Sequence, residues 1–264
     1  MNLVAVPEPV LRVANSEVRK VVSLRTNRLL GGGVALLGVV AFAALGIRFT
    51  PAVATDKHPV LGAVGAPATA VAGALALAVL ASAIFGALAA GDEYRFGSLP
   101  VSAVFTPDRN LLLGSKLAVA AWFSLVVVLA MEVVGAAALL VFGRGKAEFT
   151  VELLAVLGGV TLAAVCWAVI GASLGFLLRS PVQAIAVIIG VLVLEPLVWI
   201  TARGIGFPGF ATILPVAATV GTMSDGSYAD SAFIAPTPAA IVVLLLWTAG
   251  AGAAAWWYVQ QRDL

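Results

Sequence analysis

Residues 67–90 read PATAVAGALALAVLASAIFGALAA, a run without a charged side chain. An α-helix rises about 1.5 Å per residue, so about 20 apolar residues cross the roughly 30 Å hydrocarbon core of a bilayer. In lipid the backbone has to satisfy its own hydrogen bonds. The run is therefore predicted to be a transmembrane helix.

The composition of the whole chain agrees with a protein that lies mostly in a bilayer. Of its 264 residues, 62% are hydrophobic and 11% are charged, against about 25% charged residues in an average soluble domain. The expected fold class is an all-α integral membrane protein with six transmembrane helices in one domain, residues 29–259. Hydropathy predicts the spans 29–47, 67–90, 117–142, 153–178, 182–200 and 239–259.

The Lys and Arg residues predict the orientation of the spans. With the N-terminus in the cytoplasm, ten of the 15 basic residues fall on the cytoplasmic side. This excess follows the positive-inside rule, so both chain ends, including the tail 260–264, are expected inside. Spans rich in Ala, Val and Gly favour a bacterial source, and we expect a multi-pass protein of the cytoplasmic (inner) membrane. A net charge of +2 gives no basis for a nucleic-acid partner.

The N-terminal segment 1–28 is expected to be cytoplasmic and to contain an amphipathic helix over residues 11–28. Apolar side chains share one face and basic or polar side chains share the other. Such a helix is suited to lie on the lipid surface. A plain basic anchor before the first span explains the same pattern equally well. The residues that define the interfacial helix are Val18, Arg19, Lys20, Val21, Val22 and Arg25.

Two connections are expected to do more than join spans. The cytoplasmic connection 91–116 is charged, yet residues 99–105 read LPVSAVF, which favours docking on lipid, on the bundle or on a partner protein. A solvated loop whose charges only set the topology is the alternative. The outer segment 203–238 contains FATILPVAATVGTM, which is apolar but too short to span and predicts a re-entrant or interfacial segment. An ordinary outer loop remains the alternative there.

The sequence contains no motif for ATP or metal chemistry. Walker A is missing, so the chain is not expected to bind ATP or to act as an enzyme. His58 and Cys166, one of each, fall on different sides of the predicted membrane and give no metal-ligand spacing. We expect Cys166 to be a small buried side chain. The G-x-S-x-G string at 171–175 is interpreted as small-residue helix packing.

Two carboxylates, Glu132 and Glu195, are predicted at membrane depth. A carboxylate in lipid is costly and is by default a functional hypothesis. Both residues would then line an outward cavity or carry protons. In the alternative, each is protonated, hydrogen-bonded to a neighbouring helix or close enough to the surface to reach water.

Taken together, the spans, the basic helix and the loop resemble the permease subunits of type-2 ABC exporters. The resemblance covers nearly the whole chain, although Ser98 stands where the family usually has Thr. The loop residues that carry it are Gly91, Glu93, Tyr94, Arg95, Gly97, Ser98, Thr106, Pro107, Arg109 and Lys116. Later residues that match are Leu214, Pro215, Ala217, Ala218, Arg262 and Asp263.

The resemblance implies a separate nucleotide-binding ATPase subunit that docks on residues 91–116 and also touches Arg179. ATP and Mg would bind to that partner, and no cofactor to this chain. A second permease chain, alike or different, would complete a dimer in the lipid bilayer. The residues implied in ATPase coupling are Glu93, Tyr94, Arg95, Gly97, Ser98, Pro107, Arg109 and Arg179.

The loop charges have expected partners under this resemblance. Glu93 is expected to pair with Arg95 or with a basic group on the ATPase. Arg109 and Lys116 are expected to meet acidic residues of the ATPase or lipid phosphates. The transported substrate would be hydrophobic or amphipathic. A proton-coupled secondary transporter using Glu132 and Glu195, or a non-transporting membrane scaffold, are the alternative functions.

Overall fold

The computed structural model describes residues 8–48, 66–99, 102, 104, 108–143, 151–224 and 234–261. Most of these residues are helical, and they include no strand. The elements are α1 (Glu8–Ser23), α2 (Arg25–Arg48), α3 (Ala66–Arg95), α5 (Arg109–Gly143), α6 (Val151–Leu178), α7 (Pro181–Gly204), the 3-10 helix η2 (Pro208–Ile213), α8 (Pro215–Thr222) and α9 (Thr237–Gln261).

Six helices of the described chain are long and apolar enough to cross a membrane. They are α2, α3, α5, α6, α7 and α9. This confirms the expected all-α fold with six candidate spans. Each helix contains the apolar run predicted from hydropathy and extends beyond it by a few residues, most of all at the start of α5.

The prediction of a loop over residues 91–116 is wrong over much of its length. α3 continues to Arg95 and α5 begins at Arg109. Asp108 explains the early start of α5, because its Oδ1 accepts hydrogen bonds from the backbone N–H groups of Asn110 and Leu111 at 2.9 and 3.4 Å. Thr106 and Pro107 lie outside the described residues.

The prediction of a single helix over residues 11–28 is also wrong, because the helix is interrupted at Leu24. α1 ends at Ser23 and α2 begins at Arg25, so Arg25 belongs to the first span. The side-chain amide of Asn27 donates to the carbonyl oxygen of Val21 at 3.0 Å. This bond satisfies a carbonyl group that the break leaves without its helical partner.

The centre of the bundle is built from α3 and α6, which pack closely along small residues. A Cβ atom added to Gly171 would overlap the carbonyl oxygen of Ala83, and one added to Gly86 would overlap that of Ala168. The interpretation of the 171–175 string as helix packing is therefore confirmed. Cys166 is buried, as expected.

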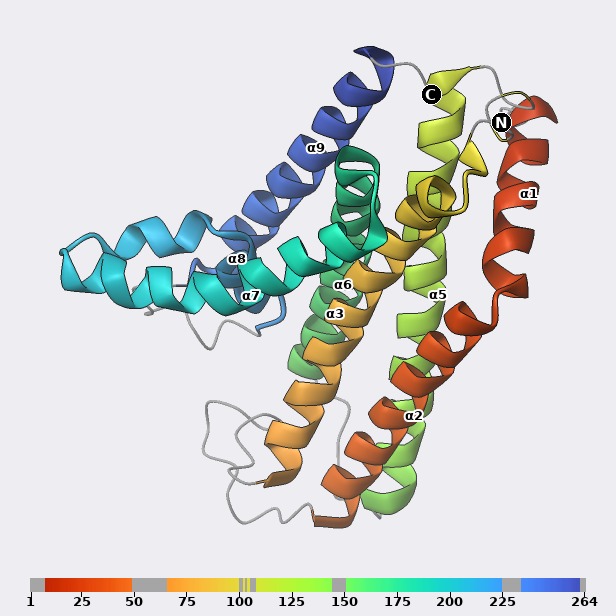
Figure 1. Ribbon diagram of the computed structural model, residues 1–264. Helices are drawn as coiled ribbons and strands as arrows, with labels where there is room; N and C mark the ends of the chain where they lie inside the picture. The colour runs from red at the N-terminus through yellow and green to blue at the C-terminus, as the bar shows by residue number, and fades with distance from the viewer. Residues whose placement is uncertain are drawn as a thin grey trace, which may run out of the picture.

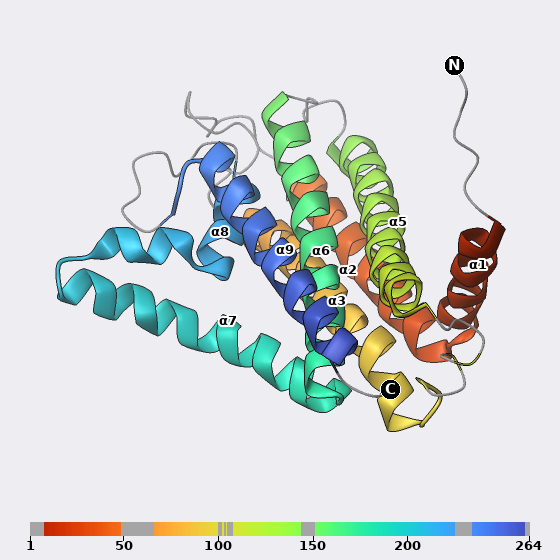
Figure 2. The same cartoon turned by 90° about the horizontal axis from the view of Figure 1, so that it is seen from above.

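Several segments distant in sequence meet at one end of the bundle, drawn at the top of Figure 1. The C-terminal ends of α3 and α9, the N-terminal end of α5 and helix α1 all lie there. α7 diverges from the other helices, and η2 and α8 return toward α6 and α9 (Figures 1 and 2). The best-connected cluster of charged side chains described below lies at the end that contains α1.

Candidate functional site

Four charged side chains join α1, α3 and α5 in a group that we call the charge cluster: Glu17, Lys20, Glu93 and Lys116. The Nζ atom of Lys116 lies 2.8 Å from Glu17 Oε2 and 2.6 Å from Glu93 Oε1. The Nζ atom of Lys20 lies 2.7 Å from Glu17 Oε1 and 3.2 Å from Glu93 Oε1. Two carboxylates thus alternate with two ammonium groups.

Three of the four side chains in the charge cluster are buried, so their ion pairs matter for stability. The side chain of Lys116 is 3% exposed, and those of Glu17 and Glu93 are 9% exposed. A buried charge is strongly unfavourable unless it is paired and hydrogen-bonded. The three buried residues, Glu17, Glu93 and Lys116, therefore depend on one another, whereas the Lys20 side chain is 47% exposed. Their contacts hold α1 in one register against α3 and α5.

The electrostatic balance keeps the α1 members of the charge cluster ionised. Burial of the Glu17 carboxyl raises its pKa, but Lys116 and Lys20 outweigh this effect and hold the pKa below its ordinary value. Burial lowers the pKa of Lys20, and its contacts with Glu17 and Glu93 outweigh that effect and raise it. Both groups therefore carry their charges at neutral pH.

The structure orients α1 differently from the expected division into one apolar and one polar face. Val21 is buried and Val18 is partly buried, in agreement with the apolar face, whereas Val22 is exposed. Arg19 is exposed, as expected. Lys20, expected on the outer polar face, instead reaches the charge cluster. The buried face is shifted because it has to include Glu17.

Glu93 and Lys116 have partners other than the expected ones. Within the chain, Glu93 contacts two lysines, Lys20 and Lys116, instead of Arg95. Lys116 is turned into the protein and contacts the carboxylates of Glu17 and Glu93. The Oε2 atom of Glu93 is buried and has no hydrogen-bond partner among the described residues.

The C-terminus of α3 ends in a tight turn that presents Arg95 and Phe96. The backbone N–H of Ser98 donates to the carbonyl of Glu93 at 3.0 Å, and that of Gly97 donates to Tyr94 at 3.3 Å. Gly97 has φ 63°, which glycine adopts without strain in this C-cap motif. Arg95 and Phe96 are exposed, and the guanidinium carbon lies 5.5 Å from the centre of the Phe96 ring.

The N-terminus of α5 is tied to the C-terminus of α9. Arg109 Nη1 donates to the carbonyl oxygen of Val259 at 3.0 Å. Asn110 Oδ1 accepts from Trp256 Nε1 at 2.7 Å and from Gln260 Nε2 at 2.8 Å. Arg109 thus has partners within the chain, and it also binds the negative end of a helix dipole.

Arg179 occupies the turn between α6 and α7. Its φ angle is 53°, an uncommon conformation for a residue with a side chain. The guanidinium carbon lies 5.8 Å from the Tyr94 ring centre and 5.4 Å from that of Tyr258. The turn also packs tightly on α3, because a Cβ atom on Gly91 would lie 2.6 Å from the backbone N of Pro181. This contact joins α3, α9 and the turn.

The two carboxylates predicted at membrane depth are both buried and both bonded to a neighbouring helix. The hydroxyl of Thr161 on α6 donates to Glu132 Oε2 at 2.9 Å, while Glu132 Oε1 has no partner among the described residues. Glu195 accepts backbone hydrogen bonds from Val216 and Ala217 of α8. One of the alternatives considered for these residues, bonding to a neighbouring helix, is thus the one observed.

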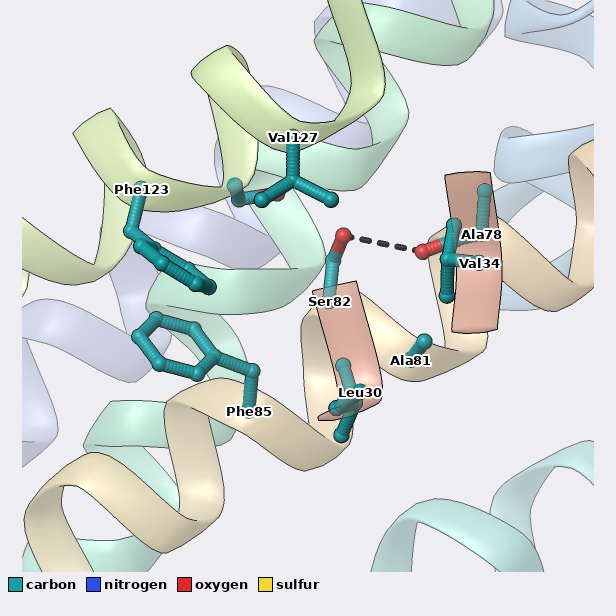
Figure 3. Close-up of a pocket in the computed structure, with 9 residues that line it drawn as sticks. Leu30, Val34, Ala78, Ala81, Ser82, Phe85, Phe123 and Val127 are labelled. Atoms are coloured by element: carbon teal, nitrogen blue, oxygen red, sulfur yellow. Dashed lines mark hydrogen bonds between the residues drawn. The ribbon is translucent and has the colours of Figure 1, made fainter. Parts of the chain in front are cut away.

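A small recess opens between α2, α3 and α5 (Figure 3). Most of its lining is apolar, including the stacked rings of Phe85 and Phe123. The hydroxyl of Ser82 donates to Ala78 at 2.9 Å. Ser124 also lines the recess, and its hydroxyl has no partner among the described residues. The recess is thus chiefly an apolar surface and is separate from the charge cluster.

Sequence reasoning missed Glu17, Asn110 and Phe96. A signal for Glu17 was present, because it precedes Val21 by four residues and therefore lies on the apolar face of α1, where a carboxylate needs a partner. Asn110 and Phe96 carried no comparable signal, since their roles depend on where α9 ends and how α3 turns.

Comparison with known proteins adds no family to this description. No protein-family model matches the chain, and no curated protein matches its sequence. The functional proposal therefore depends on the membrane fold, the contacts at the α1 end of the bundle and the sequence resemblance.

Proposed function

We propose that the chain is the transmembrane permease subunit of an ATP-binding cassette exporter in a bacterial cytoplasmic membrane. A separate ATPase subunit binds ATP and Mg and docks at the α1 end of the bundle. The exporter moves a hydrophobic or amphipathic substrate. The sequence resemblance supplies this function class, and the charge cluster is the structural observation that best supports it.

The charge cluster supports the proposal because it joins the segments that would have to move together. Glu17 and Lys20 belong to the helix before the first span, Glu93 to the end of α3 and Lys116 to the start of α5. A force applied to the connection between α3 and α5 is thus passed directly to α1. A solvated loop whose charges only set the topology would not need buried ion pairs.

The surface available to the ATPase differs from the residues implied by the resemblance. Glu93 and Arg109 make contacts within the chain, so they are positioning residues. Arg95, Phe96 and Val104 are exposed at or near the same connection. We infer that these three side chains contact the partner, with Arg179 holding the neighbouring turn in place.

The exposed helices agree with a second permease chain and surrounding lipid. In the most apolar window, 17% of α7 and 17% of α9 are buried inside this chain, against 56% of α3 and 61% of α6. α7 and α9 therefore need an apolar environment from outside the chain. A second permease chain and the bilayer together supply it.

Purification in mild detergent from the native membrane tests the proposal, with mass spectrometry of stoichiometric partners. The expected result is a co-purifying soluble protein with Walker A and Walker B motifs. A clean preparation without an ATPase, both in detergent and in lipid nanodiscs, would overturn the exporter assignment.

A matched pair of variants tests the docking surface itself. Phe96 and Phe207 are each 72% exposed, but Phe96 lies at the α3 turn and Phe207 lies before η2. Phe96→Ala should reduce the amount of co-purifying ATPase by about tenfold, as for an aromatic interface anchor. Phe207→Ala should leave it unchanged. Equal recovery with both variants would exclude Phe96 from the docking surface.

One observation at Glu132 favours a second candidate function, a proton-coupled secondary transporter. Its buried Oε1 has no partner among the described residues, and a carboxylate at membrane depth is able to bind a proton. Transport that stops with a proton-gradient uncoupler, continues under ATP depletion and is lost in Glu132→Gln would favour this function over the exporter.

A further inference from the structure

The short helix α8 lies at the depth of the spans. Trp167 Nε1 donates to Thr219 Oγ1 at 2.7 Å, and a Cβ atom on Gly159 would overlap the carbonyl oxygen of Thr222. Gly159 and Trp167 lie about 12 and 24 Å along α6 from its start, at 1.5 Å per residue. α8 therefore packs against the middle of α6.

A helix that begins at this depth needs hydrogen-bond partners for its N-terminal backbone N–H groups. The first backbone N–H groups of a helix have no partner within the helix. The N-cap residue of α8 is Leu214, which has no side-chain hydrogen bond to offer, and Pro215 follows it. Unsatisfied backbone groups are not tolerated in the hydrocarbon region unless the protein supplies a partner.

Glu195 of α7 supplies that partner. Its Oε1 accepts from the Ala217 N–H at 2.7 Å and its Oε2 accepts from the Val216 N–H at 2.9 Å. Trp199, one turn later on α7, donates its indole N–H to Oε1 at 3.2 Å. Glu195 is 4% exposed. The carboxylate thus has partners on both oxygens, and the positive end of the α8 dipole stabilises its charge.

We propose that Glu195 is the latch that holds α8 inside the bundle. The dependence is mutual, because the carboxylate needs the N–H groups of α8 and α8 needs the carboxylate. When these bonds break, both groups are left without partners in an apolar environment, and water is the remaining source of partners. α8 therefore has a docked state bonded to Glu195 and a released state in which its N-terminus is hydrated.

The consequence for transport rests on the proposed exporter function. In such an exporter, Glu195 would set the position of α8 relative to the spans α6 and α7. Neither η2 nor α8 carries a charged side chain, so the charge of the latch comes from α7. Glu195 is on this account a positioning residue with no contact to the substrate.

Hydrogen exchange measured by mass spectrometry tests the latch in the full chain, purified and placed in lipid nanodiscs. In Glu195→Gln the amide nitrogen cannot accept a bond from α8. Exchange over residues 210–222 should rise by about tenfold or more, the change expected when a helix loses its N-terminal cap. Exchange over α3 and α5 should stay as in the native chain.

Trp199→Phe is the matched control, because it removes one donor and leaves the carboxylate and both α8 bonds. Its exchange over residues 210–222 should change by less than about threefold. Unchanged exchange in Glu195→Gln, or a rise of equal size in every helix, would overturn the proposal. If Glu195→Gln does not fold, Glu195→Asp provides the same test with a carboxylate too short to reach both N–H groups, and unchanged exchange there would overturn it as well.

These measurements use the chain without an ATPase. If no ATPase co-purifies, the exporter proposal fails and the proposed role of Glu195 is unaffected. If hydrogen exchange over α8 does not change in Glu195→Gln, the role of Glu195 is overturned and the exporter proposal is unaffected.

Discussion

The position of Lys116 depends on distant parts of the chain. It stands near the start of α5, and both of its carboxylate partners come from other helices, at residues 17 and 93. A lysine this buried is stabilised only by such partners. Its contribution is thus best measured together with that of Glu17.

Lys116→Met should lower the free energy of unfolding by up to about 3–5 kcal/mol, because it leaves the buried carboxylates of Glu17 and Glu93 with the half-exposed Lys20 as their remaining partner in the charge cluster. Chemical unfolding in mixed detergent micelles measures this change. Glu17→Gln combined with Lys116→Met should cost less than the sum of the single changes, since the pair is lost only once. The exposed Arg19→Ala is the control, expected within about 0.5 kcal/mol of the native chain. If Arg19→Ala lowers the free energy of unfolding as much as Lys116→Met does, the loss cannot be assigned to the buried ion pairs of Lys116.

The docking of α1 should depend on pH at both extremes. The lowered pKa of Glu17 stabilises docking above the unfolded value, near 4.5, and the effect is lost as pH falls through the folded value. The raised pKa of Lys20 stabilises docking below about 10.5, and this is lost as pH rises through its folded value. Lys20 is nearly half exposed, so the alkaline effect should be the smaller one.

Fluorescence anisotropy of a dye on Arg19→Cys, in a Cys166→Ala chain, measures this docking. Anisotropy should stay constant around neutral pH and fall under acidic conditions. Glu17→Gln should reduce the acidic transition, because position 17 then has no carboxyl to protonate and Glu93 is the remaining carboxyl of the charge cluster. A transition of full size in that variant would assign it to another group.

At the scale of elements, the contact between α3 and α6 sets the centre of the fold. It depends on glycines at which a backbone oxygen of the facing helix occupies the place of a side chain. Backbone atoms cannot rotate away, so any added atom has to separate the two helices. The same helix, α6, offers a glycine without this constraint.

Gly171→Ala should lower the midpoint of thermal unfolding, with a cost of about 1–3 kcal/mol or more, because the new Cβ overlaps the Ala83 oxygen. Gly158→Ala is the matched change on α6, where nothing lies within 4 Å of the added atom. It should be neutral or stabilising by up to about 1 kcal/mol, since alanine favours helix. Destabilisation of equal size in both variants would show that the helices are not in close contact at Gly171.

Hydropathy predicted the interiors of the spans and failed at their ends. The interiors are governed by transfer into an apolar environment, which is a property of the local sequence. The start of α5 was missed because Arg109 and Lys116 read as a polar loop, whereas their charges are matched by α9 and by the charge cluster. The break at Leu24 was missed because the apolar spacing continues across it.

The location of the candidate site could be predicted from the sequence, but the ion pairs within it could not. The residues 91–116 and the helix before the first span were both expected to matter, and both are present at the α1 end of the bundle (Figure 1). Which lysine meets which carboxylate depends on how α1, α3 and α5 are placed in three dimensions. A single sequence contains no direct signal for such contacts between distant segments.

At the scale of the whole molecule, the unequal burial of the spans predicts where another chain binds. A photoreactive amino acid at Val193 of α7 should capture a second permease-sized chain on illumination. Val133 of α5, which is similarly exposed, should capture lipid only. Capture at both positions, or at neither, would contradict a dimer interface on α7. The experiment detects identical and different partner chains alike.

The pairing of Glu17 with Lys116 also fixes an order of events during synthesis. Lys116 follows Glu17 by 99 residues, so at about 5–20 residues per second the ribosome needs roughly 5–20 s to reach it. Throughout that interval the Glu17 carboxylate has no partner from α5. Helix α1 therefore reaches its final position only after the start of α5, the third span, has been made.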